Sequence, residues 1–122
     1  MKEDKVTVVI GASANPARYS NLAVKQLTSH GHKVIPIGIR EGTIANIPIV
    51  IGKPEVKNVD TVTLYLNAKR QGEYYDYIFS LHPKRIIFNP GAENPELEKL
   101  AAEKGIEPLE ACTLVMLSTG QY

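Results

Sequence analysis

The chain has 122 residues, of which 43% are hydrophobic, which is enough for one continuous core but leaves no room for a second catalytic domain. Its 14 Lys and Arg residues almost balance its 13 Asp and Glu residues, and the net charge of +1 provides no broad field that would attract nucleic acid or a membrane. The single cysteine, Cys112, excludes an internal disulfide. Residues 1–5 are charged, and no apolar run in the sequence approaches about 20 residues, so we expect a cytoplasmic protein.

The first third of the chain predicts a strand, a helix and a second strand. Residues 5–10 form a valine-rich apolar run, which is typical of a strand buried on both faces. Apolar residues at helical spacing then predict a helix that starts at Pro16 or Ser20 and ends at residue 30. Residues 33–37 predict the second strand, which a right-handed crossover would place parallel to the first.

The middle of the chain is less regular. Pro36 has no N–H group to donate to a strand ladder, so we expect it near the end of the second strand. Within the irregular residues 38–58, residues 47–51 predict a third strand at an edge of the sheet. Residues 60–66 predict a fourth strand, and residues 74–79 mark a helix that ends near His82 and Pro83.

The last third adds two strands and a helix. Residues 85–89 predict a strand, and Asn94-Pro95-Glu96 is typical of a helix start, with a helix to Gly105. Residues 106–109 predict a last strand, and the apolar residues 111–117 leave the type of the closing segment open. This alternation predicts one α/β domain over residues 1–122, a three-layer αβα Rossmann-like sandwich with a mainly parallel sheet of five to six strands.

The junction between the first strand and the first helix is the most informative motif. A glycine at such a junction permits a sharp turn, and the N–H groups of the following helix start then face an anion. Of the dinucleotide pattern G-x-G-x-x-G only Gly11 is present, and the Gly-Lys-Ser/Thr of the Walker pattern is absent. The alternative is a simple tight turn, but a turn alone does not need Arg18. The residues we predict to bind phosphate are Gly11, Ala12, Ser13, Pro16, Arg18 and Ser20.

Other polar residues follow the later strands. The second strand ends at Gly38-Ile39-Arg40, and a cation at this position favours the phosphorylated ribose of NADP or coenzyme A over the free diol of NAD. Arg40 beside Glu41 is alternatively a solvated loop residue. Asn67 and the segment Asn89-Pro90-Gly91 also follow strands, and parallel strands would bring all these ends to one pocket, although Asn89-Pro90-Gly91 also suits an ordinary turn.

No residue pattern predicts catalysis or metal binding. The three histidines lie next to predicted helix ends or in a turn, where they need no ligand. Cys112 lies in an apolar stretch without a neighbouring cation that would lower the pKa of its thiol, so we expect a small buried residue. We therefore predict neither catalytic nor metal-ligating residues.

The chain resembles the stand-alone coenzyme A-binding domain family, whose members are similar to the N-terminal domain of the succinyl-CoA synthetase α subunit. The resemblance covers nearly the whole chain. It departs from the family at Gly38-Ile39-Arg40, where members have Asn-Pro, and at residues 88–92, where they have a Trp-x-Gln-x-Gly segment. The residues that carry it are Val9-Ile10-Gly11-Ala12-Ser13, Pro16, Arg18, Ser20, Val24, Leu27, Gly31 and Val34-Ile35-Pro36.

This resemblance implies a Rossmann-like domain that binds the phosphates of coenzyme A with Gly11, Ala12, Ser13, Arg18 and Ser20. The phosphohistidine domain and the nucleotide-binding subunit of the synthetases are not found in the chain, so binding without turnover is expected, in a carrier, sensor or subunit. Two alternatives stay open, an NADP-binding oxidoreductase or redox sensor and a protein-interaction domain that has lost its ligand. The expected partner is a small nucleotide cofactor rather than nucleic acid or a membrane, and a protein partner stays open.

Overall fold

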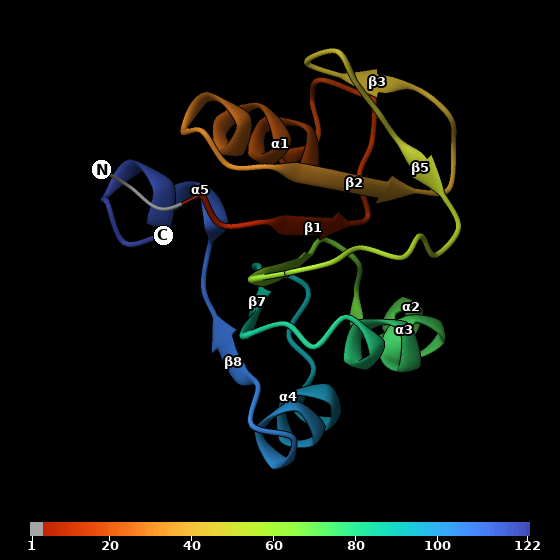
Figure 1. Ribbon diagram of the computed structural model, residues 1–122, viewed down its shortest axis with the longest axis vertical. Helices are drawn as coiled ribbons and strands as arrows, with labels where there is room; N and C mark the ends of the chain where they lie inside the picture. Colours follow the sequence, from red (N-terminus) through yellow and green to blue (C-terminus); the bar gives the residue numbers. More distant parts are fainter. Residues whose placement is uncertain (1–3) are drawn as a thin grey trace.

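A six-stranded, all-parallel sheet in the order β5-β2-β1-β6-β7-β8 forms the centre of the protein (Figure 1). The computed structural model describes residues 4–122, so residues 1–3 of the charged start lie outside the described residues. The strands of the sheet are β1 (Thr7–Ile10), β2 (Val34–Gly38), β5 (Val50–Ile51), β6 (Thr61–Leu64), β7 (Arg85–Phe88) and β8 (Glu107–Glu110). The expected three-layer α/β sandwich with a mainly parallel sheet is confirmed.

Helices cover both faces of the sheet, with α1 and α5 on one face and α2, α3 and α4 on the other (Figure 1). Their bounds are α1 (Tyr19–Ser29), α2 (Ala68–Gln71), the 3-10 turn η1 (Gly72–Tyr74), α3 (Tyr75–Ser80), α4 (Pro95–Glu103) and α5 (Thr113–Ser118). A separate two-stranded antiparallel hairpin consists of β3 (Thr43–Ile44) and β4 (Ile47–Pro48). Within residues 4–122, no helix is long and apolar enough to cross a membrane.

Alternation along the strands divides the core into two apolar clusters. In β1, Val8 and Ile10 join the cluster under α3 and α4, whereas Val9 joins Val24 and Leu27 of α1 on the other face. These side chains are completely buried, as expected for parallel strands covered by helices on both faces. The core thus fixes the carboxyl ends of β1, β2, β6 and β7 relative to one another.

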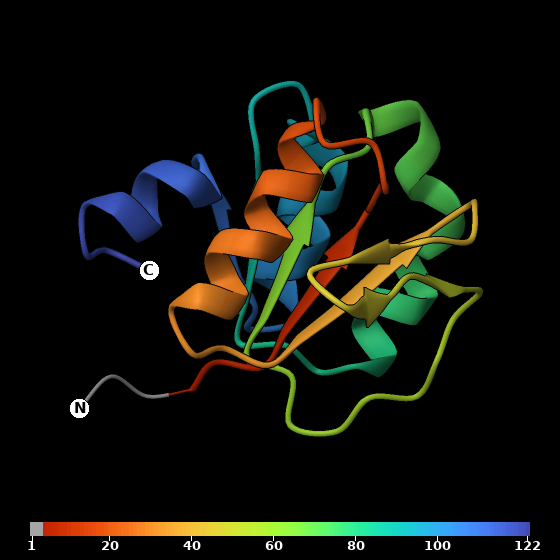
Figure 2. The same ribbon diagram turned by 90° about the horizontal axis from the view of Figure 1, so that it is seen from above.

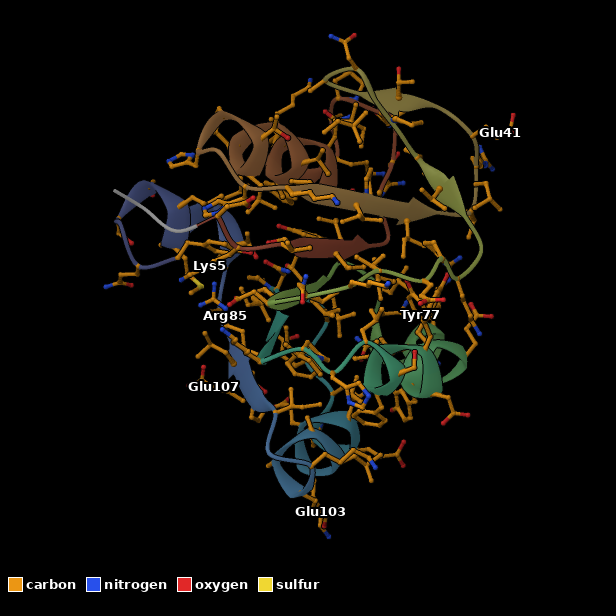
Figure 3. The ribbon with its side chains drawn as sticks, in the orientation of Figure 1. Lys5, Glu41, Tyr77, Arg85, Glu103 and Glu107 are labelled. Atoms are coloured by element: carbon orange, nitrogen blue, oxygen red, sulfur yellow. The ribbon has the colours of Figure 1, made fainter. Side chains whose placement is uncertain are left out.

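The face of the sheet under α5 is polar near its centre. Thr63 in β6 is fully buried, and its hydroxyl lies 2.8 Å from the Thr113 hydroxyl at the start of α5. At the opposite end of the same face, Arg85 donates to the backbone oxygen of Tyr122 at 3.0 Å and its guanidinium stacks on the Tyr122 ring at 4.5 Å. Lys5 lies beside Arg85 at this edge (Figure 3) and also donates to the Tyr122 backbone oxygen. The C-terminal segment is therefore attached to both ends of the strands.

Several elements differ in detail from the sequence-based expectations. The helix α1 starts at Tyr19, and Pro36 lies in the middle of β2 rather than near its end. Pro36 fits there because the carbonyl groups of Lys33 and Ile37 bond to the β1 side, and β5 pairs with β2 only at Ile37 and Gly38. The Pro36 nitrogen, which carries no hydrogen, therefore faces the outer side of β2 at a position where β5 does not pair with β2.

Three further segments were only partly predicted. Residues 47–51 do not form one strand but are divided between β4 and β5. The short helix α2 and the turn η1 precede α3, in a region where only the helix over residues 74–79 was expected. The closing segment, whose type was open, contains α5.

Candidate functional site

A cleft of about 740 Å³ opens at the carboxyl edge of the sheet. Figure 2 shows that the start of α1, the start of α2 and the loop after β7 all lie at this edge. The cleft is lined by residues 11–15, 18–20, 38–41, 65–67, 70, 74 and 90–92. It therefore lies where four neighbouring parallel strands end, which is the usual ligand position in doubly wound sheets.

Two glycines allow the backbones of three strand ends to come close together. Gly11 has a φ of +96°, and a Cβ atom at this position would lie 3.0 Å from the backbone carbon of Tyr65. A Cβ atom at Gly38 would lie only 2.5 Å from the backbone oxygen of Ala12. The N–H groups of Gly11 and Ala12 both donate to the Ile37 carbonyl, at 3.0 and 2.9 Å. The turn after β1 is thus held against β2 and β6 by backbone contacts alone.

The loop between Gly11 and α1 is ordered by its own polar groups. The side-chain amide of Asn21 donates to the Ser13 carbonyl at 2.9 Å, and the Ser13 hydroxyl oxygen accepts from the Asn15 N–H at 3.1 Å. No side chain caps the start of α1, where Arg18 is the N-cap residue. The first N–H groups of an uncapped helix carry partial positive charge, so they are suited to an anion in the cleft.

The side-chain oxygen of Asn21 is a second unusual feature of this loop. Asn21 is 2% exposed, and its Oδ1 atom is buried with no hydrogen-bond partner in the described part of the chain. We predicted no role for Asn21 from the sequence, although Asn21 lies on the buried face of α1 together with Val24 and Leu27. Its position beneath Ser13 makes it a support of the loop.

Three arginines line the cleft from three different strand ends. Arg18 precedes α1, Arg40 follows β2 and Arg70 lies in α2 after β6. Within residues 4–122, none of their guanidinium groups forms an ion pair, since the described salt bridges involve only Lys84, Arg85 and Asp60, and none has a hydrogen bond to another described residue. Among residues 4–122, Glu41 is the only acidic residue that lines the cleft, and Figure 3 shows it at the outer edge of the molecule. The lining of the cleft therefore carries more positive than negative charge.

Most residues predicted from the sequence to bind the cofactor line this cleft. They are Gly11, Ala12, Ser13, Arg18, Ser20, Gly38, Arg40, Asn67, Pro90 and Gly91. Asn67 also caps α2, since its side-chain oxygen accepts from the Arg70 N–H at 3.2 Å. The lining residues that the sequence did not indicate include Arg70, Tyr65 and Tyr74.

Pro16 and Asn89 do not line the cleft. Pro16 is exposed beside the loop. Asn89 is 2% exposed and points into the protein, where it donates to Thr63 Oγ1 at 2.6 Å and to the Leu64 carbonyl at 2.9 Å. Its side-chain oxygen accepts from the Thr113 N–H at 2.9 Å. The side chain of Asn89, predicted to contact the ligand, thus uses both of its polar atoms to join β6, β7 and α5.

Tyr65 forms part of the cleft wall on the α5 side. Its hydroxyl is buried, and none of its contacts has hydrogen-bond geometry. Burial raises the pKa of Tyr65 above its usual value, and the hydroxyl groups of Thr113 and Thr63 oppose only part of this rise. Tyr65 thus presents an uncharged, protonated phenol to the cleft.

No metal-ligand set is found in the described part of the chain. Among residues 4–122, no group of three His, Cys, Asp or Glu residues could hold a metal ion. Cys112 is half-buried at the N-cap of α5 and does not line the cleft. The arrangement offers positive charge and backbone donors, which are the chemistry of anion binding.

The chain is similar to one known protein family and to several solved proteins. The family model described as a CoA binding domain matches residues 5–118. A solved protein described as uncharacterized is 49% identical, with a TM-score of 0.96, and the match covers 99% of this chain and 100% of that one. A conserved hypothetical protein from Pyrococcus furiosus is 27% identical, with a TM-score of 0.76 and coverage of 93% and 98%.

A hypothetical protein from Pyrococcus horikoshii is 23% identical, with a TM-score of 0.83 and coverage of 93% of this chain and 81% of that one. At this level of identity the likeness concerns the fold alone. No curated protein matches the chain.

Proposed function

The chain belongs to the CoA-binding domain family, and from this membership we propose that residues 1–122 are one domain that binds coenzyme A or an acyl-CoA in the cleft without catalysing a reaction on it. The observation that carries the proposal is the set of unpaired arginines around the turn after β1. Coenzyme A carries a diphosphate and a phosphorylated ribose, so its charge is complementary to this cleft.

In this proposal, Ser13, Arg18 and Ser20 bind the diphosphate together with the first N–H groups of α1. Arg40 binds on or near the phosphorylated ribose, because it follows β2, where Rossmann-like domains hold the adenosine ribose. Leu66, Pro90 and Ala92 offer an apolar wall at the other end of the cleft. A wall of this kind suits the uncharged pantetheine arm.

The proposed role is that of a carrier, a sensor or a subunit. It is supported by a cleft whose arginines and backbone donors are suited to holding anions. The domain would bind and release an acyl-CoA without any change in the acyl group of that ligand. A partner protein would then supply any chemistry.

NADP is the second candidate ligand, favoured by the position of Arg40 in the cleft. A phosphorylated ribose is common to NADP and coenzyme A, so Arg40 alone does not distinguish them. The absence of Gly at positions 13 and 16 favours coenzyme A, because a dinucleotide fingerprint uses glycine there for close approach of the backbone to the diphosphate.

A thermal-shift panel of coenzyme A, acetyl-CoA, NAD, NADP and ATP tests the proposal. A ligand at 100 times its dissociation constant adds about 2.7 kcal/mol to the free energy of unfolding. We expect a clear rise in melting temperature with coenzyme A or acetyl-CoA and a smaller one or none with the other ligands. A rise with NADP and none with either coenzyme A species would overturn the proposal in favour of NADP, and no response to any ligand would favour an interaction domain.

A further inference from the structure

Arg70 and Arg18 enter the cleft from opposite faces of the sheet. Arg18 is the N-cap residue of α1, which covers the same face as α5, whereas Arg70 belongs to α2 on the face of α3 and α4 (Figure 1). Because β1 and β6 are neighbours in the sheet, the loops that carry these two arginines are adjacent. The space between them is the crevice between the ends of β1 and β6. The connection after β1 leads to one face of the sheet, and the connection after β6 leads to the other face.

The position of Arg70 is fixed at its backbone while its guanidinium stays free. The Arg70 N–H donates to the Asn67 side chain at 3.2 Å. Its neighbour Gln71 is fully buried and donates to the carbonyl groups of Leu66 and Ala92 at 2.8 and 2.7 Å. The guanidinium itself has no hydrogen bond or ion pair in the described part of the chain, and its charge lowers the pKa of the nearby Tyr74 phenol against the larger raising effect of burial.

We propose that Arg70 is a second diphosphate-binding residue, which holds the ligand's diphosphate from the β6 side while Arg18 and the loop after β1 hold it from the α1 side. The inference rests on the proposed function. A diphosphate presents non-bridging oxygens in several directions, so two guanidinium groups on opposite sides bind it without competing for the same oxygens. Arg40 follows β2, which is separated from β6 by β1 in the sheet. Arg40 therefore binds a different part of the ligand, the phosphorylated ribose.

Lys69 provides a matched control for this role. It is exposed like Arg70, carries the same charge and is the preceding residue of α2, but it does not line the cleft. Lys69→Ala and Arg70→Ala therefore change the net charge of the protein equally. A difference between the two variants measures contact with the ligand rather than a general electrostatic effect.

Calorimetric titration with coenzyme A and with 3′-dephospho-coenzyme A tests the assignment. Arg70→Ala should weaken the binding of both ligands by similar factors, roughly 10- to 100-fold, as expected when a charge-assisted hydrogen bond is lost. Lys69→Ala should bind both ligands like the unmodified protein. Arg40→Ala should weaken coenzyme A much more than the dephospho form, because only coenzyme A carries the ribose phosphate.

The outcomes separate the inference from the proposed function. If the unmodified protein binds neither ligand, the proposed function fails and the role of Arg70 fails with it. If the unmodified protein binds but Arg70→Ala behaves like Lys69→Ala, only the role of Arg70 is overturned. A loss confined to coenzyme A would also overturn it, since it would place Arg70 on the ribose phosphate. Arg70→Lys, which retains the charge but not the fork of donors, should give an intermediate loss with unchanged melting temperature.

Discussion

Gln71 joins two loops of the cleft through its side-chain amide, which donates to the Ala92 carbonyl at 2.7 Å and to the Leu66 carbonyl at 2.8 Å. The side-chain oxygen of Gln71 accepts from Asn94 at 2.9 Å, and Asn94 in turn caps α4 by accepting from the Leu97 N–H. Leu66 and Ala92 both line the cleft. One buried amide thus determines the distance between the loops after β6 and β7.

Gln71→Leu should destabilise the protein and also weaken ligand binding. The variant leaves the Leu66 and Ala92 carbonyl groups without the Gln71 amide and removes one of the two acceptors of the Asn94 amide, which keeps the Tyr75 hydroxyl. Each unsatisfied buried group costs about 1–3 kcal/mol. Urea unfolding measures the loss of stability. Affinity measured well below the melting temperature measures the displacement of the loops, and a variant that is destabilised but binds normally would contradict a positioning role for Gln71.

Arg18→Ala should weaken coenzyme A binding by about 1–3 kcal/mol, the contribution of a hydrogen bond to a charged group. Titration calorimetry provides the measurement. Lys25→Ala removes the same charge from an exposed position of α1 outside the cleft and should bind normally. Equal affinities of the Arg18 variant and the unmodified protein would remove Arg18 from the site.

Gly38→Ala should destabilise the protein because the added Cβ meets the Ala12 backbone oxygen at 2.5 Å. A backbone atom has little freedom to move away, so we expect a cost of about 1–3 kcal/mol, typical of overpacking, together with weaker ligand binding. Gly72→Ala is the matched control. Gly72 has helical dihedral angles and open space around its Cβ position, so this variant should be stabilised by about 0.4–1 kcal/mol. A stable Gly38→Ala variant with normal affinity would show that the turn after β1 can move away from β2.

Asn89→Ala should destabilise the protein by about 2–3 kcal/mol, since the Thr113 N–H and the Leu64 carbonyl would lose a buried partner. The comparison is Ser118→Ala, which removes an exposed hydroxyl of α5 and should change the stability by less than about 0.5 kcal/mol. Chemical denaturation distinguishes the two. Similar stabilities would mean that water replaces the Asn89 contacts.

Glu110 should make the stability depend on pH. Its hydrogen bond to Glu98 and the negative charge of that group raise the pKa of Glu110 above its ordinary value of 4.5. A raised pKa in the folded state means that the stabilising contribution is complete below the unfolded-state pKa and is lost as the pH rises through the folded-state pKa. Glu110→Gln should therefore raise the melting temperature slightly at pH 7 and leave it unchanged at low pH. Glu103→Gln on α4 serves as the control, and an equal response of both variants at pH 7 would contradict the role of the Glu98 contact.

The sequence contains strong signals for the sheet and for one side of the cleft. Apolar runs that end at Gly11 and Gly38 predict where two strands stop, and in a parallel sheet those ends share one edge. The helix α2 was missed because its four residues are too few to show an apolar period, and Arg70 was missed with it. A residue on an unrecognised helical turn cannot be assigned to the cleft.

The orientation of Asn89 could not be predicted for a different reason. Its partners Thr63 and Thr113 lie far away in the chain, and only the assembled sheet and α5 bring them together. The composition Asn-Pro-Gly suits both an exposed loop and a buried junction. The position of Pro36 was equally ambiguous, since whether a strand tolerates proline depends on which neighbour its N–H would face.

The walls of the cleft come from four segments, each of which follows a different strand of the sheet and is separated from the next by at least one further strand. No short fragment of the protein contains the site, so a ligand reports on the cooperative unfolding of the sheet as a whole. Hydrogen exchange at the buried amides of β1, β2, β6 and β7 should slow together when the cleft is filled, by the same factor at each strand. The effect of the ligand on hydrogen exchange would therefore report the fraction of molecules that are folded, rather than the movement of one loop.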